Sequence, residues 1–82
     1  MKTKLAAYIA ADILKDPDRA IAGDEALISS GLIDSFSLVD LALFVEDNFG
    51  VQLDDAELTS TVFDTLDQLV TLLAERGADS QA

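Results

Sequence analysis

The chain has eighty-two residues, half of them hydrophobic, and no Pro/Gly-rich tract, so we expect one small domain over residues 1–82 that folds around its own core. A formal net charge of −11 argues against nucleic acid or an anionic membrane as a partner and favours a basic protein surface. Cysteine and histidine are absent, which excludes disulfides, thiolate metal sites and nucleophile pairs of the Ser-His or Cys-His type.

Neither a targeting segment nor a membrane span is predicted. The start, Met1-Lys2-Thr3-Lys4-Leu5, has two lysines but no long apolar region, so we expect no signal peptide. No apolar run approaches the roughly 20 residues that a helix needs to cross a bilayer. We therefore expect a soluble, cytoplasmic monomer without membrane insertion.

The first helix is expected over residues 3–15. Leu5, Ile9 and Ile13 recur at helical spacing, and the many alanines around them favour helix and allow close packing. Pro17 should end this helix, because the residue before a proline is pushed out of the helical region.

A long connection over residues 16–33 follows. A loop of this length is unusual in so small a domain and is often functional. Gly23 and Gly31 are expected to supply its sharp bends. Its apolar residues are spaced like anchors onto the bundle: Ile21, Leu27, Ile28, Leu32 and Ile33.

The second helix is expected from about residue 35 to Phe49. Either Asp34 or Ser35 can cap its start, and Gly50 should stop it. At about 100° per residue, the helix has two apolar stripes. One is an ordinary core stripe: Leu38, Leu41, Ala42, Val45 and Phe49.

The second stripe lies on the opposite face of this helix. Phe36, Val39 and Leu43 form it, interleaved with Asp40 and Asp47. In one interpretation, Phe36 folds back over the core edge, and the other two are scattered surface residues. In the other, the stripe is an acid-rimmed apolar docking surface beside an exposed serine.

The remainder of the chain predicts two further helices. Residues 54–58 favour a short helix with acids in its first turn. The last helix should begin near Asp64 or Thr65 and close at Gly77. The polar residues 78–82 are predicted to form a frayed tail. The apolar stripe of the last helix is Leu66, Leu69, Val70 and Leu73.

The fold class that these elements predict is all-α. No strand-like alternation or internal repeat occurs in the sequence. We expect a four-helix bundle with three main helices, one short third helix and a long first loop.

The sequence contains no pattern that favours a metal site or enzymatic catalysis. In a calcium loop counted from Asp16, Ile21 would occupy the sixth position, which needs glycine, and Leu27 the twelfth, which needs glutamate. The acids between Asp54 and Glu57 could bind a divalent ion weakly, but a solvated helix start is the better interpretation. We therefore expect no metal site and no enzyme activity.

Ser35 remains as the candidate recipient of a modification. It lies where a long loop meets a helix N-terminus, so its hydroxyl should face solvent. Backbone N–H groups and the dipole at that end can hold an anionic phosphate. Taken alone, a serine after an aspartate at a helix start is more often a plain N-cap.

The residues around Ser35 resemble a known site. Residues 31–41, which read GLIDSFSLVDL, resemble the phosphopantetheine attachment site of acyl and peptidyl carrier proteins, whose motif is Asp-Ser-Leu or a close variant. Residues 24–31 and 45–51 resemble the approach to that site and the end of its helix. Size, acidity and helix order agree as well. Phe36 departs from the leucine most often found there.

This resemblance implies that Ser35 carries a 4′-phosphopantetheine, attached through a phosphodiester by a phosphopantetheinyl transferase that uses coenzyme A. The terminal thiol of the arm would hold an acyl or aminoacyl group as a thioester. Asp34 would fix the start of the helix. The positions that partner enzymes read would be Phe36, Val39, Asp40, Leu43 and Asp47.

The implied partners are an acyl- or aminoacyl-loading ligase or transferase, and synthase or condensing enzymes. The chain length suggests a freestanding, type II carrier in fatty-acid, polyketide or nonribosomal-peptide biosynthesis, and the Gly-Leu-Ile-Asp-Ser form slightly favours specialised metabolism. The alternative is an acidic helical interaction or adaptor module that is not phosphopantetheinylated.

Overall fold

The computed structural model describes residues 2–77, and this part of the chain is helical without strands. The predicted all-α bundle, with three main helices, one short third helical element and a long first loop, is confirmed. The tail predicted for residues 78–82 lies outside the described residues. In chain order the elements are α1 (Lys2–Tyr8), the π-helical η1 (Ile9–Ile13), α2 (Ser35–Phe49), the 3-10 turn η2 (Asp55–Glu57) and α3 (Leu66–Glu75).

The first helix is shorter than predicted and changes type. After α1 the chain continues as η1, in which the Leu14 amide donates to the Ile9 carbonyl at 2.9 Å, five residues back. The helix ends at Ile13, so Lys15, predicted as helical, lies outside it with a φ of 58°. The left-handed Lys15 ends the helix, and the Asp16 amide closes it by donating to the Ala10 carbonyl at 2.8 Å. Pro17 then disfavours helical geometry at Asp16.

α2 has the predicted bounds. Asp34, and not Ser35, is its N-cap, with the Asp34 carboxylate accepting a hydrogen bond from the Ser37 amide. At the other end Gly50 has a φ of 73° and donates its amide to the Glu46 carbonyl. Glycine adopts this left-handed conformation without a steric penalty, which is why the helix ends there.

α3 and η2 both begin with reciprocal capping. The Thr65 hydroxyl accepts from the Gln68 amide, and the Gln68 side chain accepts from the Thr65 amide, each at 3.1 Å. This confirms the predicted start of the last helix, and Gly77 follows its end with a φ of 79°. Asp54 and Glu57 make a similar box, but the segment they start is a single 3-10 turn.

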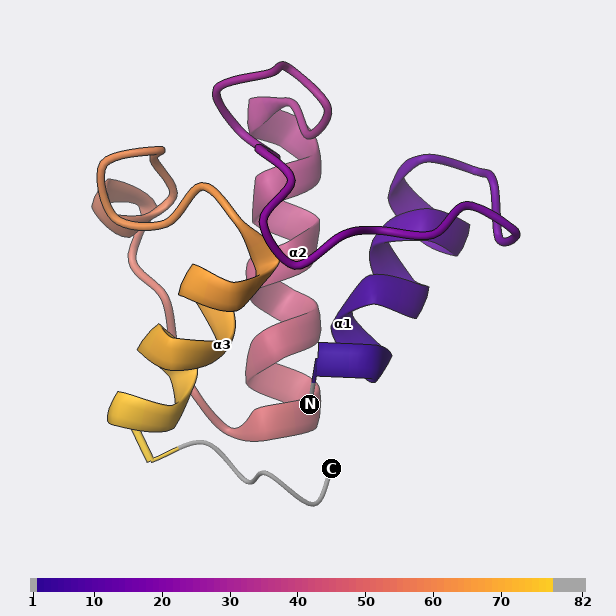
Figure 1. Ribbon diagram of the computed structural model, residues 1–82. Helices are drawn as coiled ribbons and strands as arrows, with labels where there is room; N and C mark the ends of the chain where they lie inside the picture. Colours follow the sequence, from indigo (N-terminus) through magenta and orange to yellow (C-terminus); the bar gives the residue numbers. More distant parts are fainter. Residues whose placement is uncertain (1, 78–82) are drawn as a thin grey trace.

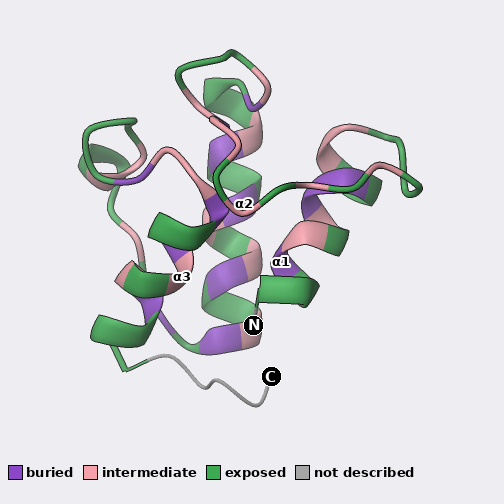
Figure 2. Ribbon diagram, viewed as in Figure 1, coloured by how far each residue is buried: buried purple, intermediate pink, exposed green. Residues whose placement is uncertain are grey.

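α1 and α3 project on the two sides of α2 in Figure 1, and they also contact each other directly, with Lys2 on α1 paired with Asp67 on α3. Along α2, buried residues alternate with exposed ones, so only one of its faces enters the core (Figure 2). Within residues 2–77, the structure contains no helix with the length and apolar character needed to cross a bilayer. The buried core comprises Leu5, Ile9, Leu27, Ile33, Leu38, Leu41, Val45, Phe49, Val51, Phe63, Leu66, Leu69 and Leu73.

The long connection is fixed to the bundle as its apolar residues predict. Leu27 and Ile33 are buried, and the other three anchors pack partly buried against the core. Gly31 has the positive φ of a sharp bend, at 79°. Gly23 does not, and a Cβ there would lie 2.5 Å from Nζ of Lys2, so the exposed Lys2–Asp67 ion pair would have to shift to make room for a side chain.

Candidate functional site

Ser35 is the first residue of α2, and it is exposed. The preceding residue, Asp34, has extended backbone and turns its carboxylate back over the helix start, where Oδ1 accepts from the Ser37 amide at 2.8 Å. Hydrogen bonds from the backbone and then the side chain of Ser37 lower the pKa of Asp34. The carboxylate is therefore ionised at neutral pH, and it stabilises the helix end that presents the serine.

Because Asp34 takes the Ser37 amide, this amide is not free to bind a phosphate. The prediction that backbone N–H groups at this helix end can hold a phosphate therefore does not apply to the Ser37 amide. The exposed hydroxyl of Ser35 is left as the group to which a phosphate can be bonded. These residues fit a phosphodiester that is held covalently, with the ionised Asp34 keeping the helix start in place.

A closed loop precedes the serine. The Ile33 amide donates to the Leu27 carbonyl at 2.9 Å, which joins the two ends of the segment 27–33. Both of these residues are buried, whereas Ser29 to Gly31 at the tip are exposed. We call this segment the approach loop. It brings the chain from the core directly to the start of α2.

Asp64 was not recognised as a site residue from the sequence, where it is only a possible helix cap. In the structure its carboxylate accepts hydrogen bonds from the approach loop, at Ile28 and Ser29. The hydroxyl and amide of Ser29 are the first causes of its lowered pKa. Asp64 and Ile28 are 36 residues apart in the sequence, so no local pattern could indicate this contact.

The second stripe of α2 is exposed. Phe36 is 84% exposed, Val39 48% and Leu43 55%, so Phe36 does not fold back over the core edge. Asp40 and Asp47 are exposed too and lie on the same face as these three residues. The structure thus brings together all five residues of the predicted docking surface, and their role in docking stays a prediction.

Val39 and Leu43 also form one wall of a hollow of about 240 Å³ between α2 and the segment around η2. Across it, the Gln52 side chain donates to a carboxylate oxygen of Glu46 at 3.0 Å. Sequence reasoning missed this hollow, because it exists only once residues 51–58 fold back onto α2. The other residues that line it are Ala42, Leu53, Asp54, Asp55 and Leu58.

The acids near η2 are engaged in local structure. Glu57 pairs with Arg76 beyond the end of α3, and this hydrogen bond is the first cause of the lowered pKa of Glu57. Over the part of the chain that the structure describes, no three His, Cys, Asp or Glu residues are grouped so that they could hold a metal ion.

The family comparison agrees with this site. A family model described as phosphopantetheine attachment site matches residues 4–73, which include Ser35, the approach loop, all of α2 and most of α1 and α3. A comparison with curated proteins gave no match. Members of the matched family are non-catalytic carriers to which 4′-phosphopantetheine is covalently attached. The chain belongs to the phosphopantetheine-binding family of acyl and peptidyl carrier proteins.

Proposed function

We propose that this protein receives 4′-phosphopantetheine on Ser35 and carries acyl or aminoacyl groups to partner enzymes. The observation that supports this most strongly is an exposed serine at the first position of α2, within the matched segment and behind an aspartate cap. The pathway would be of the fatty-acid, polyketide or nonribosomal-peptide type. The Gly-Leu-Ile-Asp-Ser form slightly favours specialised metabolism.

The attachment step is a phosphoryl transfer from coenzyme A. The Ser35 oxygen forms a bond to the phosphorus that carries the pantetheine, and the pyrophosphate P–O bond of coenzyme A breaks. Adenosine 3′,5′-bisphosphate leaves with the bond electrons, and the hydroxyl proton passes to a base on the transferase. The bound arm then supplies a thiol that carries cargo as a thioester.

The protein's own residues position the arm and do not catalyse. The sequence has no cysteine or histidine, so it lacks the usual side chains for thioester exchange. Asp34 holds the start of α2 in place through the Ser37 amide. We also propose that the protein is cytoplasmic and that it is a monomer, since mutual repulsion at a net charge of −11 opposes self-association.

We further propose that Phe36, Val39, Asp40, Leu43 and Asp47 form the surface that partners bind, and we call it the docking face. Its exposed apolar centre and its acidic rim support this role. Suitable partners present a basic rim around a small apolar patch, so that charge sets the encounter rate and apolar contact holds the complex. These partners are the transferase, a loading ligase or transferase, and synthase or condensing enzymes.

Intact mass spectrometry tests the attachment. The purified protein is incubated with coenzyme A and a broad-specificity phosphopantetheinyl transferase, and we expect a mass gain of one arm. Ser35→Ala should show no gain, while circular dichroism stays helical, because Asp34 and not Ser35 caps α2. Ser37→Ala is the matched control, since it keeps its backbone amide and should load fully.

Two outcomes would contradict the proposal. Loading of Ser35→Ala at another residue would overturn the site assignment. A wild-type protein that never gains the arm, under conditions in which a reference carrier loads, would favour the acidic interaction module that is not phosphopantetheinylated.

A further inference from the structure

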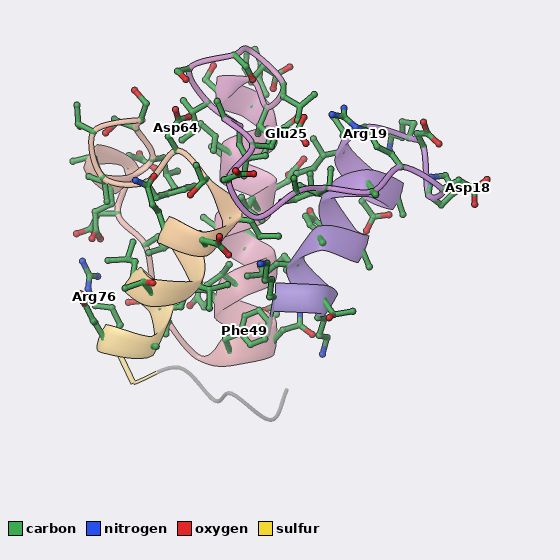
Figure 3. The ribbon with its side chains drawn as sticks, in the orientation of Figure 1. Asp18, Arg19, Glu25, Phe49, Asp64 and Arg76 are labelled. Carbon is green, nitrogen blue, oxygen red and sulfur yellow. The ribbon has the colours of Figure 1, made fainter. Side chains whose placement is uncertain are left out.

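Asp64 lies just before α3 (Figure 3), and its carboxylate accepts hydrogen bonds from the approach loop. Its Oδ1 accepts from the amides of Ile28 and Ser29, each at 2.8 Å. Its Oδ2 accepts from the Ser29 hydroxyl at 2.5 Å. The Leu27 amide adds a backbone bond to the Asp64 carbonyl at 2.6 Å. Three consecutive residues of the loop are thereby attached to one residue of a distant segment.

This carboxylate is not needed to cap α3. Thr65 and Gln68 form the capping box at the helix start. The Gln68 side chain also accepts a hydrogen bond from the Asp64 amide at 2.7 Å. The carboxylate is therefore free for the loop. Hydrogen bonds to a charged carboxylate are stronger than neutral ones, so this contact can fix a loop that is otherwise exposed at its tip.

The approach loop transmits this contact to the start of α2. The Leu27 carbonyl, next to the bonded Ile28, accepts from the amide of Ile33 at 2.9 Å. Ile33 is two residues before Ser35. Within the loop, the Gly31 amide donates to the Ile28 carbonyl at 3.0 Å, which fixes the tip relative to the same anchor. Asp64 is thus connected, through the approach loop and the Ile33–Leu27 hydrogen bond, to the residues that lead into Ser35.

We propose that Asp64 is a positioning residue for the attachment site. It holds the approach loop in the conformation in which the loop and Ser35 are presented together to the transferase. This inference rests on the proposed function of Ser35. Without the carboxylate the loop samples other conformations, and the transferase must order it on binding. Such a cost falls on binding and raises KM, while kcat is little changed.

The test is steady-state loading by the transferase with three full-length variants. For Asp64→Ala we expect KM for the carrier to rise about tenfold, with kcat within about twofold of wild type. Asp64→Asn should restore KM, because its Oδ1 can accept both amides and its Nδ2 can donate to the Ser29 hydroxyl. Asp18→Ala is the control: it removes an equal charge from an exposed residue of the connection that contains the approach loop, and it should load like wild type.

Amide spectra of the unloaded protein give a readout independent of activity. In Asp64→Ala the Ile28, Ser29 and Ile33 amide signals should shift or broaden, while those of Leu41 and Val45 in the core of α2 stay in place. If Asp64→Ala does not fold, Ser29→Ala replaces it. That variant loses only the hydroxyl bond, and its KM should rise about threefold.

The outcomes separate this inference from the proposed function. Failure of wild type to load refutes the proposed function, and the positioning role with it. If wild type loads and a folded Asp64→Ala or Ser29→Ala loads with the wild-type KM, Asp64 is not a positioning residue. The positioning role is also refuted if Asp64→Asn is as impaired as Asp64→Ala, because the amide keeps the acceptor for the Ile28 and Ser29 amides, and the defect would then come from the lost charge and not from the lost hydrogen bonds.

Discussion

The ring of Tyr8 on α1 stacks on the ring of Phe44 on α2, with centroids 4.1 Å apart and ring planes inclined by 16°. Phe44 also meets Phe49 edge to face, with centroids 6.1 Å apart. Burial, followed by the charges of Asp40 and Asp12, raises the pKa of Tyr8. Phe44 is therefore a residue of the α1–α2 interface, although its position in the sequence places it beside the docking face.

This stack predicts different effects for two phenylalanines of α2. Phe44→Ala should lower the free energy of unfolding by about 2 kcal/mol, less than a fully buried phenylalanine because Phe44 is only partly buried. Phe36→Ala should stay within about 0.5 kcal/mol of wild type, since that side chain is exposed. Urea unfolding monitored by circular dichroism measures both. Equal losses would contradict the packing described for these residues.

Acid should first stabilise and then destabilise the protein. Mild acidification reduces the net charge of −11 and its repulsion, so we expect the melting temperature to rise. Asp34, Glu57 and Asp64 have folded-state pKa values below their ordinary values of 3.8, 4.5 and 3.8. The stabilisation from these carboxylates is complete above the ordinary values and is lost as pH falls through the folded ones.

Melting temperatures between about pH 7 and pH 2 measure this profile. Asp64→Asn, which cannot titrate, should lose less stability at the acid end than wild type. Asp18→Asn is the control and should follow the wild-type curve. A wild-type melting temperature that falls steadily from neutral pH would show that charge repulsion contributes little to stability.

Salt should stabilise the folded protein. Sixteen acidic and five basic residues leave most carboxylates without a cationic partner, so screening relieves more repulsion than attraction. The Lys2–Asp67 pair is exposed, and losing such a pair costs little. We expect added salt or millimolar divalent cation to raise the melting temperature in differential scanning calorimetry. A melting temperature insensitive to both would contradict this expectation.

The docking face predicts a charge effect that depends on salt. Asp40→Lys combined with Asp47→Lys should slow transfer onto or from the arm, most strongly at low salt, because charge mainly sets the encounter rate. Leu43→Ala should weaken docking with less salt dependence, since it removes apolar contact area. Stopped-flow or single-turnover transfer with a cognate enzyme measures both effects.

A matched control places the same charge change elsewhere. Asp16→Lys combined with Asp18→Lys alters two exposed acids of the long connection. Transfer by this control should stay near the wild-type rate. If the Asp40 and Asp47 variant turns over as fast as wild type at low salt, partners recognise another face of the carrier. Circular dichroism should be unchanged in all variants, because these side chains are exposed.

The sequence was sufficient to predict α2 and α3, because their signals are local. The Asp34 and Thr65 caps act on amides three residues away, and Gly50 stops α2 through its own conformation. Helical periodicity alone placed the second stripe opposite the core stripe, whereas the exposure of Phe36 was decided only by the structure. Features of this kind need no knowledge of what packs against them.

Features that depend on tertiary contact could not be predicted. The alanine-rich end of the first helix has the same pattern for α and π geometry, so the π turn at Ile9 was missed. Phe44 lies at the edge of both stripes, and only its contact with Tyr8 assigns it to the interface. The bonds between Asp64 and Ser29 join segments that have no shared local pattern.

The π turn that follows α1 holds one residue more than a regular α turn, because its hydrogen bond from Leu14 spans five residues. Removing Ala11, which is exposed, would let this turn close with ordinary α geometry. Leu5 and Ile9 lie before the change and would keep their places in the core. The first helix therefore offers a position at which the length of the chain can vary by one residue during evolution or redesign without displacing Ser35.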